Sequence, residues 1–390
     1  MKKKYIIAIL MISLFLISGC TQKASSDNDA NNENSAKAVT EKSDIEEKSE
    51  TNFLLKGITL SPKSFQGDDF TGFFEKAKEM GNNNEKEIGN DNEEGIGDGN
   101  KKGMRNGNEF IISWSGDWNE LSNINNGGPK VITELAKNYN YIPLVIAQFF
   151  TQSTGKLLKP LDETTKKEYK NSAVMFAEKY KPKYIALGIE VNTLYTSSLS
   201  DSSSDFEEFV KLYNDIYDAV KAVSPDTKVF TIFQLEKMKG LNGGLFGGEN
   251  DEKKAQWFLI GKFKTDIIAF TTYPGLIYKN PSEIPDDYYS SIRANLINLP
   301  EIYKQTPVAF TEIGWHSDAS ITGWESSEEE QAEFISRFSE LTKGLNEGNS
   351  LEFLIWSFMY DQNTIQPFNS MGLIDKDGNS KAGWKIWTEK

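Results

Sequence analysis

Two glutamates directly follow short apolar runs: Glu190 comes after residues 184–189 and Glu312 after residues 308–311. Short apolar runs bounded by polar residues are typical of buried strands in a parallel sheet. The carboxyl ends of parallel strands meet at one edge, so both glutamates are expected at one rim. Two carboxyl groups, one protonated and one ionised, supply the acid and the nucleophile that hydrolysis of a glycosidic bond requires.

The rest of the chain alternates short apolar runs with amphipathic stretches of helical period, a pattern typical of repeated βα units. Helices are expected at 164–180, 205–223 and 326–345, with Ser327 before the acidic first turn of the last. Eight strands are expected, at residues 54–60, 110–114, 142–147, 184–189, 229–233, 267–272, 308–311 and 353–357.

Eight such units predict an α/β fold with a closed (β/α)8 barrel, the TIM barrel, as a single domain over residues 53–390. An open doubly wound sheet is the alternative. That fold is expected to carry a glycine-rich turn after its first strand, whereas residues 60–63 read Leu-Ser-Pro-Lys. The closed barrel is therefore preferred.

Three segments resemble one group of enzymes. Residues 311–315 (TEIGW) look like the nucleophile segment of endo-β-1,4-galactanases and plant-type β-1,3-glucanases, and residues 188–192 (GIEVN) resemble the galactanase acid/base segment. Residues 372–378 (GLIDKDG), followed by Ala-Gly-Trp at 382–384, look like the closing segment of such enzymes. Over residues 54–390 the chain thus resembles the clan A retaining glycoside hydrolases, which have (β/α)8 barrels.

The resemblance implies roles for individual residues. It makes Glu190 the general acid/base, Glu312 the nucleophile, and Tyr273, at the end of the sixth strand, the donor of a hydrogen bond to Glu312. The clan normally has asparagine before the acid/base, where this chain has Ile189. Asn192 is expected to replace that amide, because alternation along a strand sends residues 190 and 192 to the same side.

Aromatic residues near strand ends are candidates for stacking on sugar rings, with ordinary core packing as the alternative. His316 is the only histidine, so no histidine metal cluster or Ser-His-Asp triad is expected, and its imidazole is a candidate for a sugar hydroxyl. Gln148 and Gln234 are weaker candidates of the same kind. The tryptophans predicted to bind substrate are Trp114, Trp118, Trp315 and Trp356.

The N-terminus resembles a lipoprotein export signal. Three lysines precede an apolar run and small residues stand before Cys20, so residues 1–19 are expected to be removed and Cys20 to carry lipid. Residues 20–52 have no apolar period and predict a disordered tether, and the low-complexity segment 81–108 predicts a loop insertion. An uncleaved membrane helix is the alternative, and both place the domain outside the cytoplasm.

Composition narrows the possible partners. The formal net charge of −14 repels polyanions, so no nucleic-acid partner is expected. Cys20 is the only cysteine, so the fold has no disulfide, and neither a metal nor a cofactor is expected.

We therefore expect a monomeric, surface-anchored retaining glycosidase that acts on the β-glycosidic bonds of a polysaccharide or oligosaccharide, a galactan being one candidate. Two alternatives remain: a glycan-binding lipoprotein on a degenerate barrel, favoured by Ile189, and a two-lobed solute-binding protein, favoured by the anchor alone.

Overall fold

The computed structural model describes residues 54–82, 109–346 and 350–389. Its main element is a parallel sheet with the strand order β7-β6-β3-β2-β1-β11-β10-β9-β8. Its strands are β1 (Leu55–Thr59), β2 (Phe110–Asp117), β3 (Tyr141–Gln148), β6 (Tyr184–Leu187), β7 (Lys228–Phe230), β8 (Ile232–Gln234), β9 (Ile268–Thr272), β10 (Val308–Ile313) and β11 (Leu351–Trp356). Each of the eight predicted runs overlaps one of these strands or, for 229–233, two.

The sheet curls into a barrel because its two end strands are consecutive in the chain. Thr231 alone separates β7, which pairs with β6, from β8, which pairs with β9. The amide of Ile232 donates to the carbonyl of Gly188, so β8 also joins the chain that leaves β6. The nine strands thus form an eight-unit parallel barrel whose fifth strand is interrupted.

Alternation along the strands separates two apolar layers. One cluster fills the barrel interior and consists of the inward-facing residues of the strands. Its members include Ile111, Ile146, Ala186, Ala269 and Ile355. The other, larger cluster joins the outer faces of the strands to the surrounding helices. Burial on both faces explains why the strands read as nearly continuous apolar runs.

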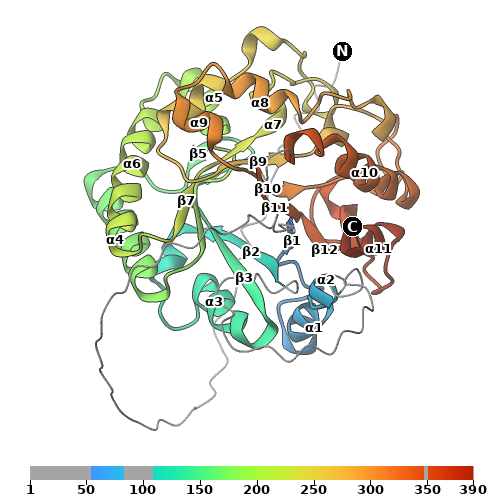
Figure 1. Ribbon diagram of the computed structural model, residues 1–390, viewed down its shortest axis with the longest axis horizontal. Helices are drawn as coiled ribbons and strands as arrows, with labels where there is room; N and C mark the ends of the chain where they lie inside the picture. The colour runs from blue at the N-terminus through green and yellow to red at the C-terminus, as the bar shows by residue number, and fades with distance from the viewer. Residues whose placement is uncertain (1–53, 83–108, 347–349, 390) are drawn as a thin grey trace, which may run out of the picture.

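Helices surround the barrel (Figure 1), with α4 and α6 on one side and α10 and α11 on the other. The predicted helices are confirmed in α4, α6 and α10, and the Ser327 hydroxyl accepts the Glu330 amide as an N-cap. The helices are α1 (Gly67–Ala77), α2 (Glu79–Asn82), α3 (Gly128–Tyr139), α4 (Glu163–Tyr180), α5 (Val191–Asp201), α6 (Asp205–Val223), α7 (Leu235–Met238), α8 (Ser291–Leu296), α9 (Glu301–Gln305), α10 (Glu328–Leu341) and α11 (Ala382–Glu389).

Long-range contacts join the two ends of the described domain. Strand β1 pairs in parallel with β11 as well as with β2. The indole of Trp387 in α11 donates to the Gly57 carbonyl at 3.2 Å, and the Lys56 ammonium donates to the Trp387 carbonyl at 3.0 Å. The first strand is therefore fixed by the last strand and the last helix.

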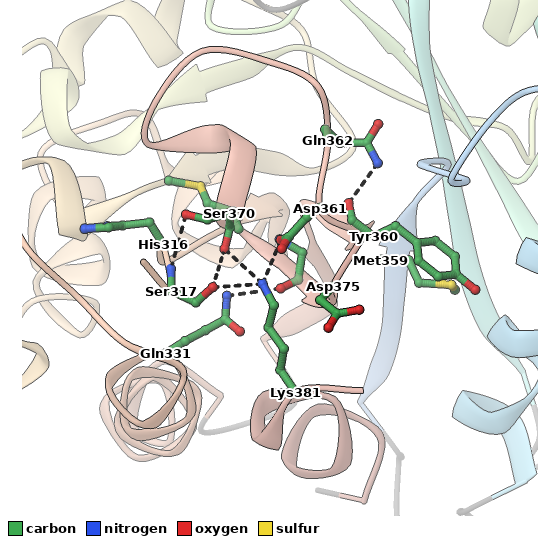
Figure 2. A network of polar contacts seen from close by, with 12 residues as sticks. His316, Ser317, Gln331, Met359, Tyr360, Asp361, Gln362, Ser370, Asp375 and Lys381 are labelled. Atoms are coloured by element: carbon green, nitrogen blue, oxygen red, sulfur yellow. Dashed lines mark hydrogen bonds and ion pairs between the residues drawn. The ribbon is translucent and has the colours of Figure 1, made fainter. Parts of the chain in front are cut away.

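Two short sheets extend the loops, one of β4 (Phe150–Thr151) with β5 (Lys156–Leu157) and one of β12 (Phe358–Tyr360) with β13 (Gly372–Ile374). A buried ion pair fixes the second: the Lys381 side chain, 3 % exposed, donates to Asp361 Oδ1 at 2.7 Å. Figure 2 shows the same ammonium bound to Ser317 Oγ, at 2.8 Å, and the Ser370 carbonyl. The segment after β10 is thereby tied to the start of α11.

Residues 1–53 and 83–108 lie outside the described part of the chain. The predicted signal, Cys20, the tether and nearly all of the predicted loop insertion therefore stay predictions. Within the described ranges, no helix combines the length and the apolar character needed to cross a bilayer.

Replacing Lys381 by methionine should leave the buried Asp361 carboxylate without its cation. We expect the free energy of unfolding to fall by about 3 kcal/mol, because an uncompensated buried charge is strongly destabilising. Urea denaturation followed by tryptophan fluorescence measures it. Lys385→Met, at an exposed position in α11, which begins directly after Lys381, should change stability by less than about 0.5 kcal/mol. Equal effects in the two variants would contradict this role for Lys381.

Candidate active site

The chain turns sharply after β6, and this turn places Glu190. Gly188 has φ +87°, and a Cβ there would lie 2.7 Å from Val191, so the position requires glycine. Glu190 itself has φ 55° and is the N-cap residue of α5. A non-glycine residue in the left-handed region costs free energy and is concentrated at functional sites. The predicted run 184–189 is thus a strand only to Leu187.

A β-bulge in β10 places Glu312. Phe310 pairs with Phe270, but Glu312 pairs with Thr271, so Thr311 is one extra residue in the ladder. Ala309 packs in the barrel interior and Phe310 in the outer layer. Regular alternation would send Glu312 outward, and the extra residue turns it inward instead.

Two neutral donors and one cation surround the Glu190 carboxyl, which is 4 % exposed. Thr271 Oγ1 donates to its Oε1 at 2.8 Å and Gln234 Nε2 donates to the same oxygen at 3.4 Å. Burial raises the pKa of Glu190, and the nearby charge of Lys237 with the two hydrogen bonds opposes that rise.

Glu312, also 4 % exposed, has fewer stabilising contacts. The Tyr273 hydroxyl donates to its Oε2 at 2.6 Å and accepts a hydrogen bond from Ser357 Oγ at 3.0 Å. Burial, followed by the charge of Glu190, raises the pKa of Glu312 to about 8, and the Tyr273 hydrogen bond opposes the rise. Tyr273 thus donates a hydrogen bond to Glu312, the contact that the resemblance implied.

The charge of Glu190 acts on the Glu312 side of the site, where it adds to burial in raising the pKa of Glu312 and of Tyr273. Two buried carboxyls that repel each other hold a proton between them well above pH 4.5. In the free protein Glu190 has more groups that favour its ionised form than Glu312 has. A proton on Glu312 is therefore held well above the usual pH range of a glutamate.

A cavity of about 220 Å³ opens beside Glu190. Its polar lining includes Gln152, Ser153, Lys237 and Asn242, and its apolar lining includes aromatic side chains of the loops above the barrel. A cavity with apolar walls and a few convergent polar groups beside a buried carboxyl is the usual form of a small-molecule site.

Asn192 does not have the predicted role. It lies in α5, where its Nδ2 donates to the Gln234 carbonyl and to Gln256 Oε1, both at 3.1 Å, and its Oδ1 accepts the Gln234 amide at 2.9 Å. Both ends of the amide are occupied within the protein. The prediction assumed a strand through residue 192, but the chain becomes helical after Glu190. The side chain of Ile189 packs in the barrel interior.

The four tryptophans belong to the packing between elements and do not line the cavity. Trp118, Trp315 and Trp356 are fully buried, with each indole nitrogen donating within the protein, to Tyr169 O, Ser326 Oγ and Met371 O. Trp114 is half-buried on the outer side of β2, against the backbone of Gly116 and Gly128. No sugar ring can stack on the three buried indoles, which corrects the prediction for Trp118, Trp315 and Trp356, and the Trp114 ring lies outside the cavity.

His316 is buried as well. Its Nε2 lies 3.0 Å from the Trp324 carbonyl. Because a carbonyl oxygen only accepts, the proton of the ring must lie on Nε2, which donates this hydrogen bond. Burial lowers the pKa of His316, so the ring is neutral at pH 7. The residue does not line the cavity, and the predicted contact with a sugar hydroxyl is not supported. Among the described residues, no cluster of histidine, cysteine and carboxylate side chains is suited to a metal ion.

Sequence reasoning missed the groups that follow the fifth strand. Lys237 reaches the Glu190 cavity, and Glu236, fully buried, accepts hydrogen bonds at Oε1 from Thr272 Oγ1 and the Tyr273 amide, both at 3.0 Å. Glu236 thereby holds the backbone of the tyrosine that contacts Glu312. The signal was present, since the rule that strand ends carry the reactive groups applies equally to the residues after Gln234.

The fold resembles solved enzyme structures at low sequence identity. A family 39 glycoside hydrolase from Bacteroides cellulosilyticus is 15 % identical, with a TM-score of 0.52 over 85 % of this chain and 62 % of its own. A β-glucuronidase from an uncultured Clostridium species is 14 % identical, with a TM-score of 0.51 over 86 % of this chain and 50 % of its own. A β-galacturonidase from Eisenbergiella tayi is 13 % identical, with a TM-score of 0.50 over the same shares.

These likenesses establish the architecture, a parallel α/β barrel that known glycoside hydrolases also have. The chain spans between half and 62 % of the length of these three proteins. No protein-family model matches the sequence, and no curated protein matches it.

The raised pKa of Glu312 predicts a pH-dependent stability. The folded protein prefers the protonated carboxyl, so the stability from this residue is full below about pH 4.5 and is lost as pH rises through about 8. Glu312→Gln should therefore be more stable than the wild type at pH 9, by on the order of 3 kcal/mol.

Thermal unfolding from pH 5 to pH 9 measures the difference. Glu333→Gln, an exposed position in α10, should run parallel to the wild type across this range. Burial likewise raises the pKa of Glu236, to about 7. The effect of Glu236 on the pH dependence of stability is common to the wild type and both variants, so it does not affect the comparison. A Glu312→Gln curve parallel to that of the wild type would show that Glu312 titrates normally.

Proposed function

We propose that the protein is a glycosidase that hydrolyses a β-glycosidic bond of a polysaccharide or oligosaccharide with retention of configuration. One observation carries the proposal: two buried glutamates at the ends of β6 and β10 share one site, and a tyrosine from β9 donates to one of them at 2.6 Å. The clan A resemblance of the surrounding segments and the barrel fold support the same conclusion.

In the proposed reaction the Glu312 carboxylate attacks the anomeric carbon and forms an ester while the bond to the leaving oxygen breaks. Glu190 gives its proton to that oxygen. Glu190 then takes a proton from a water molecule, whose oxygen attacks the anomeric carbon and releases Glu312. Tyr273 orients Glu312, and the hydroxyl of Thr271 orients Glu190.

The proton must lie on Glu190 when the reaction starts. In the free protein Lys237 and two hydrogen bonds favour the ionised form of Glu190. A substrate oxygen that accepts a hydrogen bond from Glu190 favours the protonated form instead, and the negative charge then belongs to Glu312. We infer that substrate binding fixes the productive arrangement of a proton that the pair already shares.

A glycan-binding protein without hydrolytic activity is the second candidate, and Ile189 is the observation that favours it. The chain has no amide at this position for the sugar 2-hydroxyl, and Asn192 is fully bonded elsewhere. Contacts at that hydroxyl are worth several kcal/mol in the transition state, so their loss reduces turnover much more than binding.

Azide rescue tests the two catalytic roles directly. Purified protein is first screened on galactan, β-glucan, mannan and aryl β-glycosides. Glu312→Ala should lower kcat by at least about 1000-fold, and sodium azide should restore turnover with an α-glycosyl azide as product. Glu190→Ala with azide should give the β-glycosyl azide, because the covalent intermediate still forms.

The configuration of the azide products tests the roles assigned to the two glutamates, and product release by the wild type decides between the two candidates. The same anomer from both variants would refute the assigned roles. Binding of a polymer without any release of product by the wild type would establish the glycan-binding candidate. Glu333→Gln serves as the control for general effects of removing a carboxylate and should retain full activity.

We also propose that the protein is exported, anchored to the membrane through lipid on Cys20, and active as a monomer on carbohydrate outside the cytoplasm. The support is the lipoprotein-like signal and the polar segment 20–52. Such an anchor and tether would hold the barrel near the cell surface and leave its cavity accessible to a polymer.

Cys20→Ser should abolish the lipid anchor. In cells given a radiolabelled fatty acid, the wild-type chain should be labelled and sediment with membranes, and the variant should be unlabelled. Ser18→Ala, which keeps a small residue before the cysteine, is the matched control and should behave as the wild type. A labelled Cys20→Ser protein would contradict the proposal.

A further inference from the structure

The cavity beside Glu190 contains hydrogen-bond donors that the protein itself does not use. Gln152 is 7 % exposed, and its Nε2 has no hydrogen-bond partner among the described residues. The buried Ser153 hydroxyl likewise has no hydrogen-bond partner among the described residues. A buried polar group without a partner costs about 1–3 kcal/mol, so these two groups favour a ligand that accepts hydrogen bonds.

Lys237 lines the same cavity and adds a positive charge. Its ammonium donates to Thr193 Oγ1 at 2.8 Å, and an ammonium has three donors. Burial lowers the pKa of Lys237, and the charges of the Glu190 and Glu236 carboxyls oppose that fall and favour the ammonium form. Asn242 is a further polar side chain of the lining, and among the residues that the structure describes Lys237 is the only cation on the walls of this cavity.

We propose that this cavity binds the carboxylate of an acidic sugar, with Lys237 as its counter-charge and with Gln152 and Ser153 as neutral donors. The proposal rests on the proposed function and names the substrate class of that site. A carboxylate accepts several hydrogen bonds and carries one negative charge, which matches one cation and two unpartnered donors. The aromatic lining residues Phe246 and Phe368 provide apolar surface for the ring.

Glu190 lies on the same cavity, and its ionised form would repel an acidic sugar. The conflict is removed when Glu190 carries the proton that it needs as general acid. Lys237 then loses the charge of one of its two carboxylate neighbours, and the sugar carboxylate replaces it. Binding of an acidic sugar and protonation of Glu190 therefore favour each other, a coupling that a neutral sugar does not produce.

Equilibrium binding tests the assignment without relying on turnover. The probes are D-glucuronate and D-galacturonate, their neutral counterparts D-glucose and D-galactose, and glucose 6-sulfate as an anion of different shape. Titration calorimetry with the wild-type protein should give at least one uronate a Kd about tenfold or more below that of its neutral counterpart.

Lys237→Met should raise the Kd for the uronate by at least tenfold and leave that for the neutral sugar within about twofold. Gln152→Leu should raise the uronate Kd severalfold, and it decides the question if Lys237→Met does not fold. Lys137→Met, which removes an exposed charge from α3, is the matched control and should bind as the wild type. Equal Kd values for uronate and neutral sugar would overturn the proposal, as would tighter binding of the sulfate.

Turnover separates this inference from the proposed function. Hydrolysis of neutral glycosides by a protein that does not distinguish uronates would support the glycosidase and refute the acidic-sugar site. Uronate binding that depends on Lys237, without hydrolysis of any glycoside, would support the site and refute the glycosidase. Hydrolysis of aryl β-uronides, reduced at least tenfold more by Lys237→Met than hydrolysis of neutral glycosides, would support both.

Discussion

Closure of the sheet is the constraint on which the site depends. The chain passes through Thr231 from a strand that pairs with β6 to one that pairs with β9, and the two edges of the sheet therefore meet. The end of β6 carries Glu190, and β9 and β10 carry Thr271 and Glu312. An open sheet would leave these strands at opposite edges, whereas the barrel holds them around one mouth. The contact between Thr271 and Glu190 crosses this junction directly.

Local irregularities of the backbone then orient the two glutamates that closure of the sheet brings together. Regular strands would point Glu312 toward the outer helices and would carry the chain past Glu190 in extended form. The bulge at Thr311 and the left-handed conformation at Glu190 depart from regularity at the two glutamates themselves. Both departures bring a carboxyl into a buried environment, where its charge is costly and its protonation responds to every neighbouring group. That sensitivity is what an acid and a nucleophile require.

The sequence predicted the fold well because the strands are buried on both faces and the helices are long and amphipathic. All eight strand runs and the Ser327 cap agree with the structure, since these signals are local. Predictions that needed side-chain direction were weaker. Asn192 was assigned to a strand that ends at Leu187, and the tryptophans were assigned to the mouth because strand ends there are rich in them. Their direction depends on helices that pack across the sheet.

The residues of the cavity illustrate a second limit. Gln152, Asn242 and Phe368 come from three segments far apart in the chain, and nothing in the local pattern of any one of them indicates that they share a cavity. Only the barrel brings them together. By contrast, Glu236 and Lys237 follow the end of the fifth strand, so the position rule that found Glu190 and Glu312 would also have selected them.

The contacts between Trp387 and β1 have a consequence for the order of folding. The first strand is paired on one side with β11 and is bonded at Gly57 by a residue 330 positions later. During synthesis one edge of β1 therefore stays unpaired until β11 and α11 have been synthesised, near the end of the chain. A topology with such distant contacts folds slowly, and the growing chain exposes apolar strands for the whole of that interval. A chaperone that shields β1 and β2 until α11 emerges would act on the step that this architecture makes late.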